Sequence, residues 1–392
     1  MLAPAIIAVR GFAAPEALLN FQRARELGLD LARVEEMYQL LFHLASMHEL
    51  RGEYRLAEQV LEDRLRLPRA KDHTAVQIDS DALLACSFFH QGQFSQSIER
   101  AEDGVDLYGP QQHAGLFASF GEDPAVLCHG WAALSLWCLG YADQSLERVE
   151  RSLELAGHPD LLFSLAGAKV RAANVYQLRR DPSQTLHWAT EAAVLAEEHG
   201  YLYKSSFARA LKGWALAMTG QPADGLILAQ QEMALLDRIG ANMDRPYLLA
   251  LLSEITAANG QPSEALAQVT DALGLMRESR TYFYEAELYR RRGVLVLQIG
   301  GRAAEDEAEA NFRQALEIAS KQKAKALELR AAMSLCRLLQ GRGMPQEGLK
   351  ALVAVYGWFK EGAGTADLTE AKELVTGSAH TSPSVRRAES RG

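Results

Sequence analysis

The apolar residues of this chain recur with the period of an amphipathic α-helix, most clearly between positions 305 and 319. Within that stretch Ala308, Phe312, Ala315 and Leu316 stand at i, i+4, i+7 and i+8, so they share one face of a helix. The small residues allow a neighbouring helix to come close, and the aromatic ring fills the space between the two. The stretch therefore predicts a helix that packs tightly on a neighbour.

The same pattern follows a turn rich in glycine or proline at intervals of about 40 residues. The eight turns contain Gly52, Gly92, Gly140, Asp181, Gly220, Gly260, Gly301 and Gly341. Seven intervals separate them, and six of these are 39 to 41 residues long. Each holds two helical patterns, and a pair of helices cannot bury its apolar face without neighbours. We therefore predict an all-α solenoid of about eight helix-turn-helix units.

Two of the helices begin with an aspartate followed by a proline. Asp181 precedes Pro182, and Asp123 precedes Pro124. An aspartate carboxylate can accept hydrogen bonds from the first free amides of a helix, and proline is tolerated at the first helical position. We expect Asp181 to be an N-cap, and Asp123-Pro124 to mark the start of the helix that follows the insertion.

The remaining interval, from Gly92 to Gly140, is longer, 48 residues, and contains an insertion near residues 107–124. Gly109 and Pro110 break the preceding helix there. Three large apolar residues follow, namely Leu116, Phe117 and Phe120. We expect a loop folded back onto the solenoid. The alternative is a plug or a contact surface for a partner.

The two ends differ from the repeated region at 15–375. Residues 1–14 carry no clear pattern, and the first helical face after Pro15 resembles the second helix of a unit, so we expect the array to begin mid-repeat, as a fragment of a longer protein would. Residues 376–392 have one large aliphatic residue and no aromatic residue, which predicts a disordered tail.

The repeated unit resembles the tetratricopeptide repeat. Gly52, Tyr54, Ala57 and Leu61 match its first part, and the helix containing Phe312 matches its second. Other residues replace the usual alanine at Ser97, Ser145, Thr185, Gly225 and Gly348. The resemblance implies a right-handed α-α superhelix. The repeat is longer than the usual length of about 34 residues, from which we expect longer helices or loops and a looser superhelix.

A closer resemblance covers roughly residues 20–375. Its segments include Leu136-Trp137-Cys138-Leu139-Gly140, Arg245-Pro246-Tyr247-Leu248, Tyr284-Glu285-Ala286-Glu287-Leu288-Tyr289-Arg290 and Val355-Tyr356-Gly357-Trp358-Phe359. Together they are similar to the C-terminal repeats of large bacterial signalling proteins. In that family a class III adenylate/guanylate cyclase-like domain and a predicted STAND-type (AAA-like) ATPase domain precede the repeats. The catalytic domains themselves have no counterpart here.

Composition and charge narrow the function classes. The formal net charge is −9, which disfavours non-specific binding to nucleic acid or anionic membranes. Four cysteines lie in apolar helical runs without a CxxC pair, which predicts buried free thiols in a reducing compartment. No run of 18 apolar residues is present, so we expect no membrane span and a cytoplasmic protein.

The motifs of several enzyme classes are missing from the sequence. We find no GxxxxGK[ST] phosphate-binding loop, no HExxH and no paired CxxC. The sequence therefore predicts a protein that is not an enzyme and needs no cofactor or metal ion.

Tetratricopeptide solenoids bind partners on the concave face, which is lined by the first helix of each unit. Polar residues embedded in the apolar first helices are therefore candidate groove residues. They are Tyr247, Glu254, Tyr284, Glu287, Arg290, Arg291, Glu328, Arg330 and Arg337. Arginine and tyrosine can grip a peptide through forked hydrogen bonds and flat contact area. The alternative is an intramolecular network between stacked helices.

The favoured hypothesis is a non-catalytic scaffold that binds a protein or peptide in its concave groove. On the resemblance, it would be the regulatory or sensor arm of a cyclase/ATPase-type signal-transduction protein. The alternative is a stand-alone peptide-sensing tetratricopeptide regulator. The sequence leaves self-association open.

Overall fold

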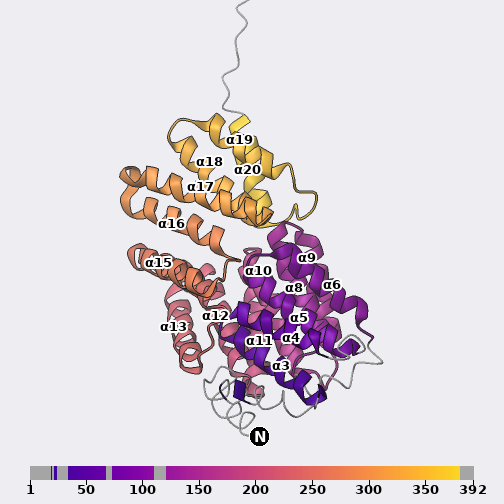
Figure 1. The fold of residues 1–392 in the computed structure, drawn as a ribbon. Helices are drawn as coiled ribbons and strands as arrows, with labels where there is room; N and C mark the ends of the chain where they lie inside the picture. Colours follow the sequence, from indigo (N-terminus) through magenta and orange to yellow (C-terminus); the bar gives the residue numbers. More distant parts are fainter. Residues whose placement is uncertain (1–18, 20–21, 24–33, 68–72, 110–120, 380–392) are drawn as a thin grey trace, which may run out of the picture.

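The computed structural model describes residues 19, 22–23, 34–67, 73–109 and 121–379, and the regular elements within them are helices (Figure 1). The first helices of the units are α3 (Val34–Leu50), α5 (Thr74–His90), α8 (Pro124–Leu139), α10 (Leu162–Leu178), α12 (Leu202–Met218), α14 (Arg245–Ala258), α16 (Glu285–Gly300) and α18 (Lys325–Gly341). The second helices are α4 (Tyr54–Arg66), α6 (Phe94–Leu107), α9 (Ala142–Ala156), α11 (Pro182–Glu198), α13 (Pro222–Ile239), α15 (Pro262–Ser279), α17 (Glu305–Lys321) and α19 (Pro345–Tyr356). The short η3 (Gly301–Ala304) precedes α17, and α20 (Ala366–Ala379) follows the last pair.

These helices form eight antiparallel pairs among the described residues, which we number unit 1 (α3 and α4) to unit 8 (α18 and α19). Each first helix packs on its partner and, in most units, also on the first helix of the next unit. The predicted all-α solenoid of about eight units is confirmed.

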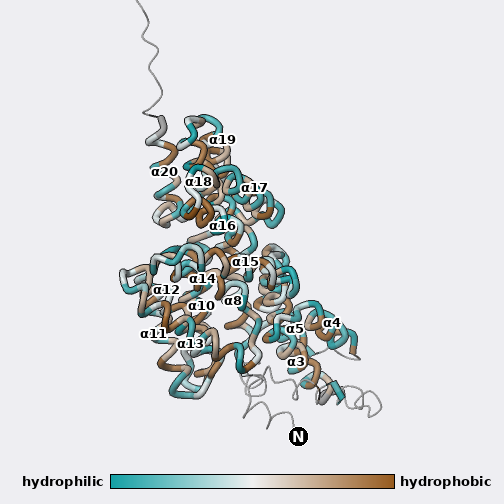
Figure 2. The backbone as a smooth tube through the Cα atoms, turned by 90° about the vertical axis from the view of Figure 1, so that its left-hand side faces the viewer, coloured by the Kyte–Doolittle hydropathy of each residue, from teal (hydrophilic) through white to brown (hydrophobic). Residues whose placement is uncertain are grey.

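The first and second helices of the units differ in how their hydrophobic residues are distributed. Helix α8 is apolar around its whole circumference and nearly all of its residues are buried, whereas α17 buries one face and exposes charged residues on the other. Figure 2 shows α17 largely coloured as hydrophilic. The first helices therefore form the inner row, and the second helices form the outer row.

The predicted packing of the helix at 305–319 is confirmed. Ala308 and Phe312 are buried in a cluster with Val296 of α16, Ala315 is also buried, and Leu316 is half-buried against the same cluster. Gly293 of α16 lies at this contact, and a Cβ atom at this position would be 2.6 Å from Cε1 of Phe312. The glycine creates the space that the ring occupies.

The predicted N-cap at Asp181 is present, and Asp123, at the predicted helix start, is an N-cap as well. The Asp123 carboxylate accepts hydrogen bonds from the amides of Ala125 and Val126 at the start of α8. The Asp181 carboxylate accepts one from the amide of Gln184 at the start of α11.

Successive turns of the superhelix contact each other through the main chain. The Leu50 carbonyl accepts hydrogen bonds from the amides of Asn242 and Met243, at 2.9 and 3.1 Å. The Tyr54 hydroxyl donates to the Met243 carbonyl, 189 residues further on. One superhelical turn therefore takes between four and five units of about 40 residues.

The same contact recurs one unit later. The His90 carbonyl accepts hydrogen bonds from the amides of Tyr282 and Phe283, at 2.7 and 3.1 Å. The expectation of a looser superhelix is therefore wrong, because these main-chain contacts hold one turn against the next.

All four cysteines are unpaired and buried, as the sequence predicted. Within the described residues, no helix combines the length and apolar character needed to cross a membrane. Helix α20 ends at Ala379, four residues beyond the end of the repeated pattern at Val375. The predictions for residues 1–14 and for most of the insertion, including Leu116, Phe117 and Phe120, fall outside the described residues, as does the tail from residue 380.

Gly293→Ala should destabilise the protein by about 1–3 kcal/mol, because the added methyl group overlaps a ring that is itself buried. Gly274→Ala is the matched control. A Cβ atom at this position in α15 meets nothing within 4 Å, so the substitution should be neutral or slightly stabilising. Denaturant unfolding of both variants measures the difference, and equal stability of the two would contradict the packing described here.

Candidate functional site: a cavity inside units 1 to 5

A cavity of about 450 Å³ lies on the concave side of the first five units. It is bounded by α3, α5, α8, α10 and α12, together with the segment at Met243 and Asp244 that closes the superhelical turn. Its walls are mainly apolar and aromatic, and they include Phe42, Leu83, Trp131, Phe163, Val170 and Phe207. The apolar inner helices and the turn-to-turn contact together form this half-open space.

One end of the cavity carries a buried cluster of three charged residues, namely Glu122, Arg171 and Lys204. The Glu122 carboxylate pairs with the Arg171 guanidinium, and its second oxygen lies 2.6 Å from Nζ of Lys204. Burial would raise the pKa of Glu122, but the two cations outweigh it and hold the pKa below its ordinary value. Burial lowers the pKa of Lys204, and Glu122 opposes that shift. The cluster therefore combines one carboxylate with two cations.

Two glycines make room for this cluster. A Cβ atom at Gly167 of α10 would lie 2.7 Å from Nζ of Lys204 and would also overlap the Glu122 carboxylate. A Cβ atom at Gly130 of α8 would overlap the Arg171 side chain. The charged groups are therefore set against the backbones of two inner helices.

Acidic groups occupy another part of the cavity wall. The Glu49 carboxyl accepts a hydrogen bond from the Ser87 hydroxyl at 2.9 Å, and burial raises its pKa to about 8. Asp244 accepts a hydrogen bond from the Tyr203 hydroxyl and lies 3.1 Å from Nε2 of His90. Glu49 is therefore mainly protonated at neutral pH and can donate as well as accept a hydrogen bond.

Cys86 also lines the cavity, with its sulfur 3.6 Å from Nδ1 of His90. A cysteine beside a histidine that contacts an aspartate resembles a nucleophile with its base. Here, however, burial is the main cause that raises the pKa of the Cys86 thiol well above its ordinary value, and the negative charge of Asp244 adds to the shift. The thiol stays protonated at neutral pH, so it is not an activated nucleophile.

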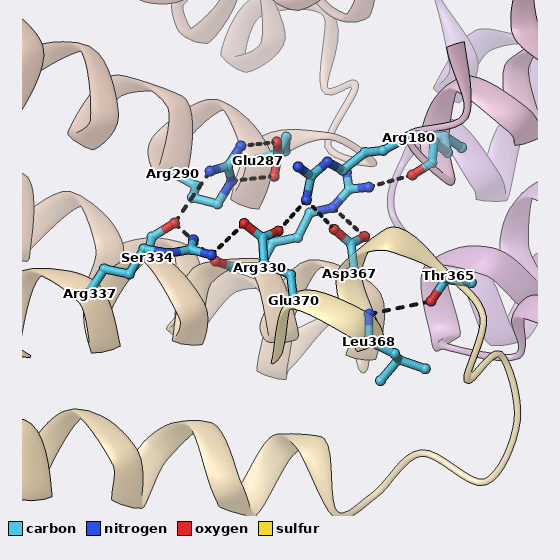
Figure 3. Close-up of polar contacts among 11 residues, drawn as sticks. Arg180, Glu287, Arg290, Arg330, Ser334, Arg337, Thr365, Asp367, Leu368 and Glu370 are labelled. Atoms are coloured by element: carbon cyan, nitrogen blue, oxygen red, sulfur yellow. Dashed lines mark hydrogen bonds and ion pairs between the residues drawn. The ribbon is translucent and has the colours of Figure 1, made fainter. Parts of the chain in front are cut away.

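Several of the groove residues named from the sequence lie in a second polar cluster, where units 7 and 8 meet α20 (Figure 3). Glu287 and Arg290 form a two-point ion pair with distances of 2.6 and 2.8 Å. Arg330 donates to Asp367 at 2.8 Å and to the Leu178 carbonyl of the preceding superhelical turn.

Two further ion pairs extend this cluster. Arg337 pairs with Glu370 at 2.5 Å, and Arg180 of unit 4 pairs with Asp367 and Glu370 at 3.0 and 2.6 Å. The cluster therefore joins α20 to unit 8 and to the preceding superhelical turn.

The remaining candidates also contact this chain. The buried Tyr247 hydroxyl lies within hydrogen-bonding distance of the side-chain oxygens of Asn174 and Gln177. Glu254 accepts a hydrogen bond from Trp214 and lies 3.7 Å from Arg291.

Glu328 pairs with Lys325, and Tyr284 packs edge-on against Tyr247. None of the nine candidates lines the cavity of units 1 to 5, and their role in binding stays a prediction.

The sequence pattern did not single out the cavity residues. Glu122, Arg171 and Lys204 come from three separate segments, so their spacing forms no motif. A usable signal was present in α10, where Arg171 lies among the small and apolar residues Gly167, Ala168, Val170, Ala172 and Ala173 of an inner helix.

No family model matches the chain. It is 27% identical over 282 residues to an uncharacterized protein of Rhizobium meliloti, a match that covers 72% of this chain and 27% of that protein. The chain thus spans about a quarter of the length of this curated relative.

Among solved structures, a Rap protein complexed with competence and sporulation factor is similar with a TM-score of 0.54 and 15% identity, covering 72% of this chain and 76% of that chain. A weaker similarity, with a TM-score of 0.43 and 12% identity, is to a STAND protein with a tetratricopeptide repeat sensor from Pyrococcus horikoshii, covering 92% of this chain and 55% of that one. The chain is a tetratricopeptide-like helical solenoid.

Asp367→Asn should lower the free energy of unfolding by about 3 kcal/mol, because the buried Arg330 guanidinium loses its anionic partner. Asp160→Asn is the control, since the Asp160 side chain is 89% exposed. Denaturant unfolding and amide exchange of α20 report the effect. If α20 exchanged equally slowly in both variants, the ion pair would not be what holds it.

Glu49 should make stability depend on pH. Its pKa is about 8 in the folded chain and near 4.5 when exposed, so folding takes up a proton between these values. Relative to Glu49→Gln, the natural chain should lose stability as pH rises from about 5 to about 8, by at most about 1.4 kcal/mol per pH unit. Unfolding at several pH values measures this, with exposed Glu99→Gln as the control. A constant difference between the natural chain and Glu49→Gln would contradict it.

Proposed function

We propose that the chain is a non-catalytic binding module that takes a peptide-like ligand in the cavity of units 1 to 5. The cavity itself carries the proposal. It is lined by inner helices of five successive units, its walls are largely aromatic and aliphatic, and a few buried polar groups converge on it. That combination is typical of a ligand site rather than of a flat protein-protein surface.

Binding in the cavity can affect the rest of the chain, because two cavity residues also hold successive superhelical turns together. Leu50 and Met243 both line the cavity, and they also form the main-chain contact between successive superhelical turns. A ligand that shifts either residue changes the contact by which unit 1 meets the start of unit 6. We propose that binding alters the curvature of the solenoid in this way and so biases a domain joined to it.

The wider context that we propose is the regulatory arm of a bacterial signalling protein of the cyclase/ATPase type. Two observations support it. Most of the Rhizobium meliloti relative lies outside the match, so in that protein the repeats are one part of a longer chain. The segments between Leu136 and Phe359 resemble the C-terminal repeats of such proteins.

The four buried free thiols support a reducing compartment such as the cytoplasm.

The alternative is a stand-alone regulator that senses a peptide. The similarity in fold to a Rap protein, solved as a complex with competence and sporulation factor, favours this version. Both versions place the ligand on the concave face. They differ in whether the effector domain belongs to the same polypeptide.

Filling the cavity should abolish ligand binding. Val170 lines it, whereas Val194 is 50% exposed on the outer helix α11, so Val170→Trp and Val194→Trp form a matched pair. Short apolar peptides screened by thermal unfolding should include binders that stabilise the natural chain and Val194→Trp but not Val170→Trp. A ligand at about 100 times its Kd adds about 2.7 kcal/mol. If no peptide stabilises the natural chain, or if each binder stabilises both variants equally, the cavity is not the binding site.

A further inference from the structure

We propose that the end of the cavity formed by Arg171 and Lys204 is a subsite for the carboxylate of an otherwise apolar ligand. This inference rests on the proposed function, because it names the chemistry of the molecule that the cavity takes. Three features of the described residues carry it: the balance of buried charge, the unused hydrogen-bond donors and the character of the surrounding walls.

The charge at this end is unbalanced. Arg171 and Lys204 share one anionic partner, Glu122, and all three side chains are only 10% exposed. The charged groups that act on the Lys204 ammonium are Glu122 and Arg171, and Arg171 opposes its protonated form. Buried charge is costly unless it is paired. One further negative charge would complete the pairing of both cations.

Hydrogen-bond donors outnumber acceptors at the same place. Of the five N–H groups of Arg171, one on Nη2 donates to Glu122, and the buried Nε has no partner in the described part of the chain. The buried indole Nε1 of Trp131 also lacks a partner there. The Arg171 guanidinium lies over the Trp131 ring, 5.8 Å from its centroid, and both residues line the cavity. Because Nε and the indole Nε1 are inaccessible, the donors left for a ligand are the other N–H groups of the Arg171 guanidinium and those of the Lys204 ammonium, and both residues line the cavity.

A carboxylate fits these requirements better than a phosphate does. It brings two acceptor oxygens and a single negative charge, which equals the excess at Arg171 and Lys204. A phosphate monoester carries a charge of about −1.5 to −2 at neutral pH and would leave the subsite negative. The neighbouring walls include Phe163 and Phe207, which suit an apolar body. Such a carboxylate comes either from the free C terminus of a short apolar peptide or from a medium-chain aliphatic acid.

The space for this subsite is built into the backbone. Gly130 and Gly167 are the positions at which any side chain would displace Arg171 or the pair formed by Glu122 and Lys204. The Lys204 ammonium also lies 4.2 Å from the centroid of the Phe163 ring, which holds it beside the apolar wall. The cations are thus positioned before a ligand arrives.

The test compares acids with their uncharged amides. The probes are N-acetyl-leucyl-phenylalanyl-leucine and its C-terminal amide, and octanoate and octanamide, titrated by calorimetry into the whole chain. Hydrogen bonds to charged groups contribute about 1.5–3 kcal/mol, so an acid should bind about 10- to 100-fold more tightly than its amide. A preference for the acid within the peptide pair assigns the subsite to a peptide C terminus, and one confined to the octanoate pair assigns it to an aliphatic acid.

Lys204→Met separates recognition from folding. It leaves Glu122 paired with Arg171, so it removes the excess charge without leaving a buried group unpaired, and the preference for acid over amide should disappear. Lys169→Met is the matched control. Lys169 lies on α10 but pairs with Glu191 outside the cavity, so this variant should keep the preference.

Glu122→Gln provides an independent test. It removes the negative charge of the cluster and leaves the two positive charges of Arg171 and Lys204 without an anionic partner there. Acid probes should bind this variant more tightly than the natural chain, and should raise its melting temperature by more, even if the unliganded variant is less stable. A purely structural role of the cluster predicts only the loss of stability.

The outcomes are distinct. Equal binding of acid and amide by the natural chain, or a preference that survives Lys204→Met, would overturn the carboxylate subsite and leave the cavity function standing. Failure of all four probes to bind at millimolar concentration would overturn the subsite. The cavity function is overturned separately, by the Val170→Trp screen, if no peptide stabilises the natural chain or if each binder stabilises both variants equally.

Discussion

The contact between successive turns of the superhelix determines the rest of the structure. Inner helices such as α8 are apolar on every side, so an open coil would leave much of their surface in water. The Leu50 and His90 carbonyls accept hydrogen bonds from amides one superhelical turn further along, and the Arg330 pair with Asp367 extends the contact to α20. The solenoid thereby encloses its inner surface, and the cavity is the part of that interior that side chains do not fill.

Charge divides the interior into two kinds of polar cluster. Around α20, each of Glu287, Arg330 and Asp367 has oppositely charged or hydrogen-bonding partners from this chain, which hold the pKa of Glu287 at about 2 despite burial. In the cavity, Arg171 and Lys204 share one carboxylate and retain unused donors. The first cluster stabilises the closed superhelix. We infer a binding role for the second because the described residues leave its charges and donors incompletely paired.

The helices and their number could be predicted because their signals are local. Turn glycines, the caps at Asp123 and Asp181 and the apolar stripe around Phe312 each act within one unit. The closed superhelix could not be predicted from the sequence. Its main-chain hydrogen bonds join residues about 190 positions apart and depend on no residue type. The sequence also led to polar residues such as Arg330 in the inner helices. It could not distinguish a charge paired within the chain from one that a ligand completes, because that depends on segments meeting in space.

Amide hydrogen exchange in the segments that join successive superhelical turns tests most directly whether the superhelix is closed. The amides of Asn242, Met243, Tyr282 and Phe283 lie in segments between helices, where exchange is ordinarily fast. If their hydrogen bonds to Leu50 and His90 close the superhelix, these four amides should exchange as slowly as those of the inner helices, and should slow further when a cavity ligand binds. Exchange at the rate of the exposed turn at Gly220 would show that the turns do not stay in contact and would contradict the account.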